Sequence, residues 1–154
     1  MTWINRNAQA IQAVAAVVTA VTAVLAVAGV LIQMRAADDT SRAQTAREAY
    51  AAHLLAAVSN PDMAEPADAC ALIASPKGAA YAAYVDHLLY ASELMLEAEP
   101  DWAATFGDSL APHATLVCNG ADAGAFTPDM TAMLEQFRAG TCPDTPTCAE
   151  VPPT

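Results

Sequence analysis

Four cysteines are the residues whose type and spacing suggest chemistry most directly: Cys70, Cys118, Cys142 and Cys148. Cys142 and Cys148 flank a five-residue segment with two prolines, so their thiols could close a short loop in an oxidising compartment. A reducible loop of this kind would suit a thiol redox protein. In the alternative interpretation, Cys70 and Cys118 are small buried residues on helices, and the C-terminal pair is incidental.

Histidines and carboxylates form a second set of residues, and they raise the question of a metal site. His53, His87 and His113 are 34 and 26 residues apart, a spacing that matches no compact zinc motif. A di-metal carboxylate bundle requires Glu-x-x-His on two helices, and no Glu of this chain has His three positions later. We therefore predict no metal and no cofactor. A ligand- or metal-sensing domain stays an alternative, with four residues in its site: His87, Glu93, Glu97 and His113.

The motifs of common enzyme classes do not occur in the sequence. It contains no G-x-S-x-G, no C-x-x-C, no phosphate-binding loop and no dinucleotide fingerprint. Ser109 precedes His113 by four residues, but no neighbouring motif suggests an oxyanion site. The sequence therefore predicts a protein that is not an enzyme.

An apolar segment near the N-terminus is the first element that must position these residues. No charged side chain occurs between Arg6 and Arg35. The centre of the segment, Ala13 to Ile32, would form a helix about 30 Å long, the thickness of a bilayer's hydrocarbon core. We predict a transmembrane helix over residues 8–34, after a flank of residues 1–7. A cleaved signal peptide ending at residues 26–28 is the alternative, although the apolar stretch is longer than such peptides need.

Small side chains mark one face of this apolar segment. Ala16 and Ala20 form a small-xxx-small pair, a spacing that lets two membrane helices approach closely. We expect the span to contact another membrane protein, or a second copy of this chain, through these two residues. The lipid bilayer itself is the remaining expected partner.

The rest of the chain is strongly acidic. All 17 acidic residues follow Arg35, against four basic residues, so residues 36–154 carry a net charge of −13. Such a domain repels nucleic acid and anionic lipid headgroups, and nucleic-acid binding is therefore excluded from the prediction. Its 119 residues suffice for one domain.

Residue periodicity predicts helices throughout this domain and no strand. The membrane helix is expected to continue as a juxtamembrane helix over residues 35–58 and to end before Pro61. Four further helices are expected: residues 66–74, 76–99, 101–118 with a break at Pro112, and 128–140. Their apolar stripes define the expected core: Tyr81, Tyr84, Val85, Leu88, Leu89, Ser92, Met95, Trp102, Phe106, Leu110, His113, Leu116, Val117, Met130, Met133, Leu134 and Phe137.

Capping and turn residues complete the predicted organisation. Ser75 is expected to cap the helix that follows it, Asn119-Gly120 to form a turn, and Thr127 to start the last helix. An acidic helical domain then occupies residues 59–140, and a proline-rich, extended tail occupies 141–154. The fold class is all-α, with one N-terminal transmembrane helix followed by a small helical bundle.

The side of the membrane that holds the acidic domain is contested. Arg35, Arg42 and Arg47 follow the span, whereas only Arg6 precedes it, and this excess favours a cytoplasmic domain. The even number of cysteines favours the opposite, oxidising side. Both interpretations stay open at the level of the sequence, with the arginines favouring the cytoplasm.

Two stretches resemble a group of bacterial one-span membrane proteins of uncharacterised function. They are the run from Ile32 to Pro61 and the stretch YVDHLLYASELMLEAEPDWAATFGDSLAPH, with Glu93, Trp102 and His113 at positions typical of the group. The resemblance implies a helical domain tied to the bacterial inner membrane and facing the cytoplasm. It implies no activity, cofactor or catalytic residue.

These observations favour a non-enzymatic, membrane-anchored interaction protein. It would be an accessory subunit of a membrane protein complex or a self-associating scaffold, because the small-residue span and the acidic domain come without a catalytic motif. The ligand- or metal-sensing domain and the thiol redox protein are the alternatives.

Overall fold

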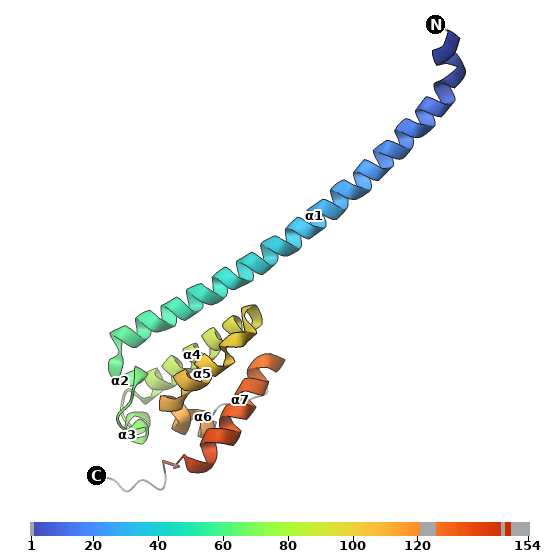
Figure 1. The fold of residues 1–154 in the computed structure, drawn as a ribbon. Coiled ribbons are helices and arrows are strands. Elements are labelled where there is room, and N and C mark those ends of the chain that lie inside the picture. The colour runs from blue at the N-terminus through green and yellow to red at the C-terminus, as the bar shows by residue number, and fades with distance from the viewer. Residues whose placement is uncertain (1, 121–125, 146, 149–154) are drawn as a thin grey trace. The chain divides into compact units, whose positions relative to one another are not determined.

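The computed structural model describes residues 2–120, 126–145 and 147–148, and all regular secondary structure among these residues is helical. This confirms the all-α prediction. The chain divides into two compact units, Met1–Ser41 and Arg42–Thr154. The first unit consists of one helical segment, and the second contains the remaining helices (Figure 1).

Helix α1 (Thr2–Ser59) has no break at the acidic pair Asp38-Asp39, where the sequence left an interruption open. Its side chains from residue 12 to residue 41 are all at least partly exposed, and most are fully exposed. The hydroxyls of Thr19 and Thr22 each donate a hydrogen bond of 2.9 Å to the carbonyl four residues earlier. These bonds satisfy the only polar side chains in the apolar core of the helix, which is long and apolar enough to cross a bilayer.

Beyond Arg42, α1 changes character and buries one face in the second unit. Ala46 and His53 are buried and Tyr50 is half-buried, at the steps of three and four that define a helix face. The helix ends at Ser59, as the proline two residues later predicts. Pro61 then starts a further helical turn, α2 (Pro61–Ala64), which the sequence did not predict.

Two short connections fix the start of the longest helix in the second unit. Helix α3 (Ala69–Ala74) begins later than the predicted residue 66, because Asp68 is extended and its carboxylate accepts the Ala71 N–H at 2.9 Å. Ser75 closes α3, since its hydroxyl donates to the Leu72 carbonyl at 2.7 Å. The Ser75 hydroxyl also accepts the Lys77 N–H at 3.1 Å, as a cap would. Helix α4 (Gly78–Ala98) nevertheless starts two residues later than the predicted residue 76, and its N-cap residue, Lys77, makes no side-chain cap.

Pro112 splits the next predicted helix into short segments, as expected from its missing N–H. The segments are η1 (Pro100–Trp102), α5 (Ala103–Leu110), η2 (Ala111–His113) and α6 (Ala114–Gly120). The predicted turn at Asn119-Gly120 is wrong, because both residues lie in the last turn of α6. There the Asn119 amide donates to the Thr115 carbonyl at 2.7 Å and keeps the residue helical.

Helix α7 (Pro128–Thr141) starts where Thr127-Pro128 predicted and passes one residue beyond the predicted stop. The Thr127 side chain makes no cap. Instead, the Thr127 N–H donates to Glu93 of α4 at 2.7 Å. The short helix η4 (Cys142–Asp144) follows directly, in a tail that was predicted to be extended.

The predicted core is confirmed almost residue by residue. Of the apolar-stripe residues, only Trp102 and Leu116 are half-buried, and every other one is buried. Helix α4 lies at the centre and contacts α3, α7 and η1. Ala46 joins this core from α1.

The predicted bond between Cys142 and Cys148 is wrong, because each cysteine is bonded to another partner. Cys142 pairs with Cys118, and Cys148 pairs with Cys70. The cause is tertiary: α6 contacts α3, α7 and η4, so the end of α7 brings Cys142 to Cys118 on α6. Cys148 then reaches Cys70 on α3, and no cysteine is free.

Candidate functional site

A cavity of about 430 Å³ in the second unit gathers most of the titratable aromatic and imidazole groups. We call it the imidazole cavity. Six of its described lining residues carry titratable groups: Tyr50, His53, Glu65, Tyr84, Asp108 and His113. They come from α1, the end of α2, α4, α5 and η2, so five separate segments must fold before the cavity exists.

His53 lies on the buried face of α1 and is only 5% exposed. Its ring packs 4.8 Å from the ring of Tyr84 and 5.7 Å from that of His87. Its Nδ1 is buried without a hydrogen-bond partner. Burial lowers the pKa of His53, and the neighbouring His87 lowers it further, so the ring is neutral at pH 7.

His113 is positioned by the proline before it, which sets the turn of η2. Its Nδ1 lies 3.0 Å from the Tyr81 hydroxyl, in a buried hydrogen bond. Burial lowers the pKa of His113 to about 4, and His53 adds to this shift. Burial also raises the pKa of Tyr81 to about 12, with a further contribution from Tyr84. His113 and Tyr81 therefore form a neutral pair at pH 7.

The rim of the imidazole cavity is acidic. Glu65 and Asp108 are exposed there, and none of the described residues that line the cavity is Lys or Arg. Ser109 also lines it, but its hydroxyl donates to the Thr105 carbonyl at 2.9 Å rather than to an imidazole. The sequence spacing of Ser109 and His113 therefore does not produce a hydrogen-bonded pair.

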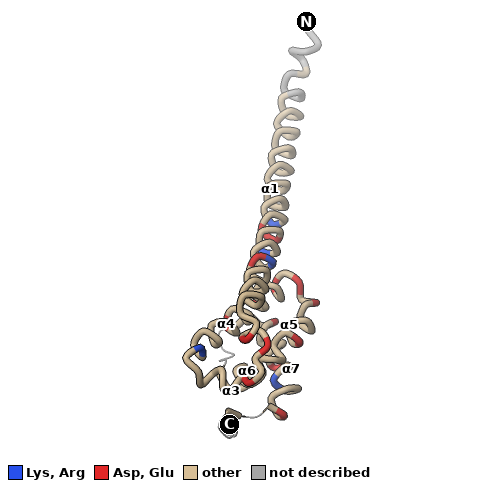
Figure 2. Tube along the Cα trace, turned by 90° about the vertical axis from the view of Figure 1, so that its left-hand side faces the viewer, with Lys and Arg blue, Asp and Glu red and all other residues tan. Residues whose placement is uncertain are grey.

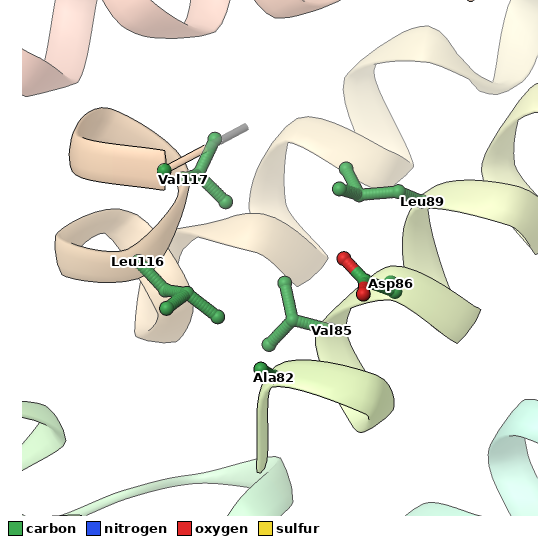
Figure 3. Close-up of a pocket in the computed structure, with 7 residues that line it drawn as sticks. Ala82, Val85, Asp86, Leu89, Leu116 and Val117 are labelled. Atoms are coloured by element: carbon green, nitrogen blue, oxygen red, sulfur yellow. The ribbon is translucent and has the colours of Figure 1, made fainter. Parts of the chain in front are cut away.

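A second cavity, of about 200 Å³, lies between α4 and α6. Figure 3 shows Val85 and Leu89 of α4 directed toward Leu116 and Val117 of α6. Asp86 is the one charged residue among its described lining residues. Its walls offer mainly dispersion contacts, so the cavity has fewer groups that could orient a polar ligand.

The residues predicted for the sensing alternative do not form a metal site. No group of three or more His, Cys, Asp or Glu among the described residues could hold a metal ion. Glu93 accepts the Thr127 N–H, and Glu97 is exposed on the outer face of α4. His87 stacks near His53, whereas His113 is bonded to Tyr81.

Three polar contacts of the second unit were missed by sequence reasoning. Glu93, which the sequence offered only as a candidate ligand, is half-buried and holds the start of α7. Glu99 accepts hydrogen bonds from Arg47 at 2.5 Å and from the Trp102 indole at 3.0 Å, and these bonds lower the pKa of its carboxyl. Only the Glu99–Trp102 spacing of three residues gave a local signal.

The small-residue pair of the first unit, Ala16 and Ala20, lies in the exposed part of α1. Larger apolar residues around it are also exposed, among them Val17 at 62% and Val24 at 69%. Between Arg6 and Arg35 the helix carries no charged side chain, and Figure 2 shows charged residues on the part of α1 nearer the second unit's helices only after this apolar segment. The pair is therefore available for contact with another helix.

Comparison with known proteins adds no relative. No protein-family model matches the chain, and neither curated proteins nor solved structures give a significant match.

Proposed function

We propose that this chain is a single-pass, membrane-anchored interaction protein that presents an acidic, disulfide-bonded helical domain on the oxidising side of the membrane. The observation that carries the proposal is the unburied apolar part of α1. None of the most apolar window of this helix is buried inside the protein. A helix that is apolar on every side and covered by no protein is stable where lipid covers it.

Two disulfides support the oxidising side. All four cysteines are bonded, and such bonds persist outside the reducing cytosol. The arginine excess after the span is a weaker argument for the cytoplasm than it was from the sequence, because Arg47 forms an ion pair with Glu99 of the second unit. The resemblance to bacterial one-span proteins supports a bacterial inner membrane but implies a cytoplasmic domain. The two disulfides outweigh it on the side of the membrane and favour a periplasmic domain.

The proposed interaction runs through the membrane helix. Ala16 and Ala20 would let a second helix approach closely, either from another membrane protein or from a second copy. The absence of a recognisable catalytic motif in the sequence favours an accessory subunit or scaffold over an enzyme. A redox role for Cys142 and Cys148 is less well supported, because they do not form a common disulfide.

Cysteine accessibility in spheroplasts tests the membrane side. The full chain is treated with a membrane-impermeant phosphine reductant, and then with a membrane-impermeant maleimide. We expect all four cysteines to react in intact spheroplasts, and none to react when the reductant is omitted. Reaction only after lysis would place the domain in the cytoplasm and contradict the proposal.

Native mass spectrometry of the detergent-purified chain tests the interaction. Ala16→Ile with Ala20→Ile should reduce the fraction found with a partner chain by about tenfold, since larger side chains separate the helices. The matched control is Val14→Leu with Val18→Leu, which has the same spacing on the opposite face. Equal loss in both variants, or loss in neither, would contradict a specific contact at the alanine pair.

A second function, a ligand-sensing domain, is favoured by one observation. The imidazole cavity holds a buried histidine whose Nδ1 has no partner within the protein. Buried polar atoms in folded proteins are generally paired, so the unsatisfied nitrogen suggests a missing contact.

A further inference from the structure

We propose that the imidazole cavity binds a small organic ammonium ion. This inference names a ligand class for the cavity and requires neither the membrane anchor nor the association through α1. The argument depends on the sign of the charges at the rim, the nature of the walls, the unpartnered histidine and the size of the space.

The charges at the rim select a cation. Glu65 and Asp108 are exposed carboxylates, and no Lys or Arg occurs among the described lining residues to neutralise them. The acidic excess of the chain, with a net charge of −11, strengthens the attraction for cations. An anionic ligand would meet repulsion from both carboxylates.

The walls suit the apolar body of an organic cation. Tyr50 and Tyr84 offer aromatic surface, and ammonium groups are attracted to the faces of such rings. Tyr50 is held in place by edge contacts with Trp102 and Phe106, each at a centroid distance of 5.5 Å. The buried Leu88 adds an apolar contact at the wall. A site with fixed aromatic walls loses little conformational entropy when a ligand enters.

The two histidines that line the cavity, His53 and His113, are compatible with a cationic ligand because both are neutral. Burial lowers the pKa of both His53 and His113, so neither ring opposes a cation at pH 7. His53 lines the cavity, and its buried Nδ1 has no hydrogen-bond partner among the described residues, so its ring can reorient and accept a hydrogen bond from an ammonium group.

The size and the ligand set distinguish an organic cation from a metal ion. The volume of about 430 Å³ lies in the range of small-molecule sites and far exceeds the space that one metal ion fills. A hard cation such as Ca²⁺ needs six or more oxygen ligands, and no group of three or more candidate ligands occurs among the described residues.

Isothermal titration calorimetry on the full chain in nanodiscs of phosphatidylcholine tests the proposal. The probes are benzylammonium, its neutral analogue benzyl alcohol, and Ca²⁺, each also titrated into empty nanodiscs. We expect benzylammonium to bind at least tenfold more tightly than benzyl alcohol, with one site per chain. Equal affinities of the two probes, or binding of Ca²⁺ alone, would overturn the proposal.

Substitutions at the rim identify the site. Glu65→Gln with Asp108→Asn should weaken benzylammonium binding at least tenfold, because both carboxylates lose their charge while keeping their shape. The control, Glu97→Gln with Asp101→Asn, removes two exposed acids that do not line the cavity and should change affinity less than twofold. Equal losses in the two variants would show a general charge effect and contradict the assignment.

Nuclear magnetic resonance provides the second measurement. During titration with benzylammonium, the ring protons of His53 and Tyr84 should shift, whereas the ring protons of Phe137, which does not line the cavity, should not. Shifts confined to residues outside the imidazole cavity would place the ammonium elsewhere and overturn the proposal.

Discussion

The two parts of α1 show opposite relations between composition and burial. From residue 12 to residue 34 the helix is almost wholly apolar, yet no side chain is buried. From Arg42 to Ser59 it is richer in polar residues, yet it buries Ala46 and His53 and half-buries Tyr50. Apolar surface that finds no protein partner requires another apolar environment, and the proposed bilayer supplies it. In the proposed arrangement, lipid surrounds α1 before Arg35, and the helix packs against the second unit after Arg42.

Loss of a disulfide should give the largest effect, and only in the second unit. Cys70→Ser with Cys148→Ser opens a bond with a sequence separation of 78. Because the unfolded chain gains conformational entropy, the free energy of unfolding should fall by about 4.5 kcal/mol. The measurement is urea unfolding followed by near-ultraviolet circular dichroism.

The second disulfide is the matched comparison for that variant. Cys118→Ser with Cys142→Ser opens a bond with a separation of 24, so the expected loss is smaller, about 3.5 kcal/mol. A larger loss from the shorter loop would mean that constraint of the unfolded chain does not govern the stability of this unit.

A large core residue should come next. Phe106→Ala removes a fully buried ring that contacts Tyr50 of α1, and it should lower the unfolding free energy of the second unit by about 4 kcal/mol. Leu55→Ala, at a position that is 70% exposed, should cost less than about 0.5 kcal/mol. Similar losses for both would contradict the assignment of Phe106 to the core and of Leu55 to the exposed face of α1. The same urea titration checks both variants.

A charge in the apolar part should act on membrane insertion instead of on folding of the second unit. Val21→Arg should disfavour insertion by about 3 kcal/mol, because a guanidinium near the centre of a span is costly to place in hydrocarbon. Alkaline carbonate extraction should move the variant from the membrane pellet to the supernatant. Val58→Arg, at an 81% exposed site, should stay in the pellet. If both variants stayed in the membrane pellet, the result would contradict the proposal that the first unit spans the bilayer.

Lowering the pH should reduce the free energy of unfolding of the second unit, by less than the disulfide and core substitutions described above. The folded-state pKa of His113 is about 4 and its ordinary value is 6.5, so the unfolded chain binds more protons between these values. Stability is therefore full above pH 6.5 and falls as the pH drops toward 4, by roughly 2 to 3 kcal/mol. His53 contributes in the same direction.

Urea midpoints between pH 7.5 and pH 4 check the acid effect. His113→Gln, which cannot titrate, should show a flatter dependence. The carboxyl of Glu99 has a lowered pKa, so its contribution is lost only below pH 4.5 and does not produce the fall above it. An unchanged slope in His113→Gln would contradict the assignment.

The smallest expected effect concerns the start of α7. Glu93→Gln replaces a charged acceptor of the Thr127 N–H by a neutral one and should cost about 1 kcal/mol. Glu97→Gln, one turn further along α4 and exposed, should cost nothing measurable. Urea unfolding of both variants provides the test, and equal values would remove the distinction between the two glutamates.

Local pattern predicted most of the fold. The helix ends at Pro61 and Pro112 and the start of α7 follow from backbone chemistry, and the buried stripe of α4 follows from helical periodicity. The membrane candidate followed from length and composition, which are also local properties.

Contacts between distant segments could not be predicted in the same way. The pairing of Cys70 with Cys148 depends on how α3 packs beside α6, and the imidazole cavity depends on five segments that meet only after folding. The contact of Glu93 could not be predicted because its partner, the Thr127 N–H, lies 34 residues away. Spacing along the chain carries no information about such encounters.

The cysteine connectivity has a consequence for biogenesis. The bond Cys118–Cys142 lies wholly within the loop that Cys70–Cys148 closes, so the two disulfides are nested. A chain that emerges N-terminus first exposes Cys70 and Cys118 before their partners, and oxidation of neighbours in that order yields two wrong bonds. In the proposed topology, the native pattern therefore requires that the whole domain cross the membrane before oxidation is complete, or that an isomerase reshuffle early bonds. Maturation of this protein should depend on disulfide isomerase activity more strongly than that of a protein whose cysteines pair consecutively.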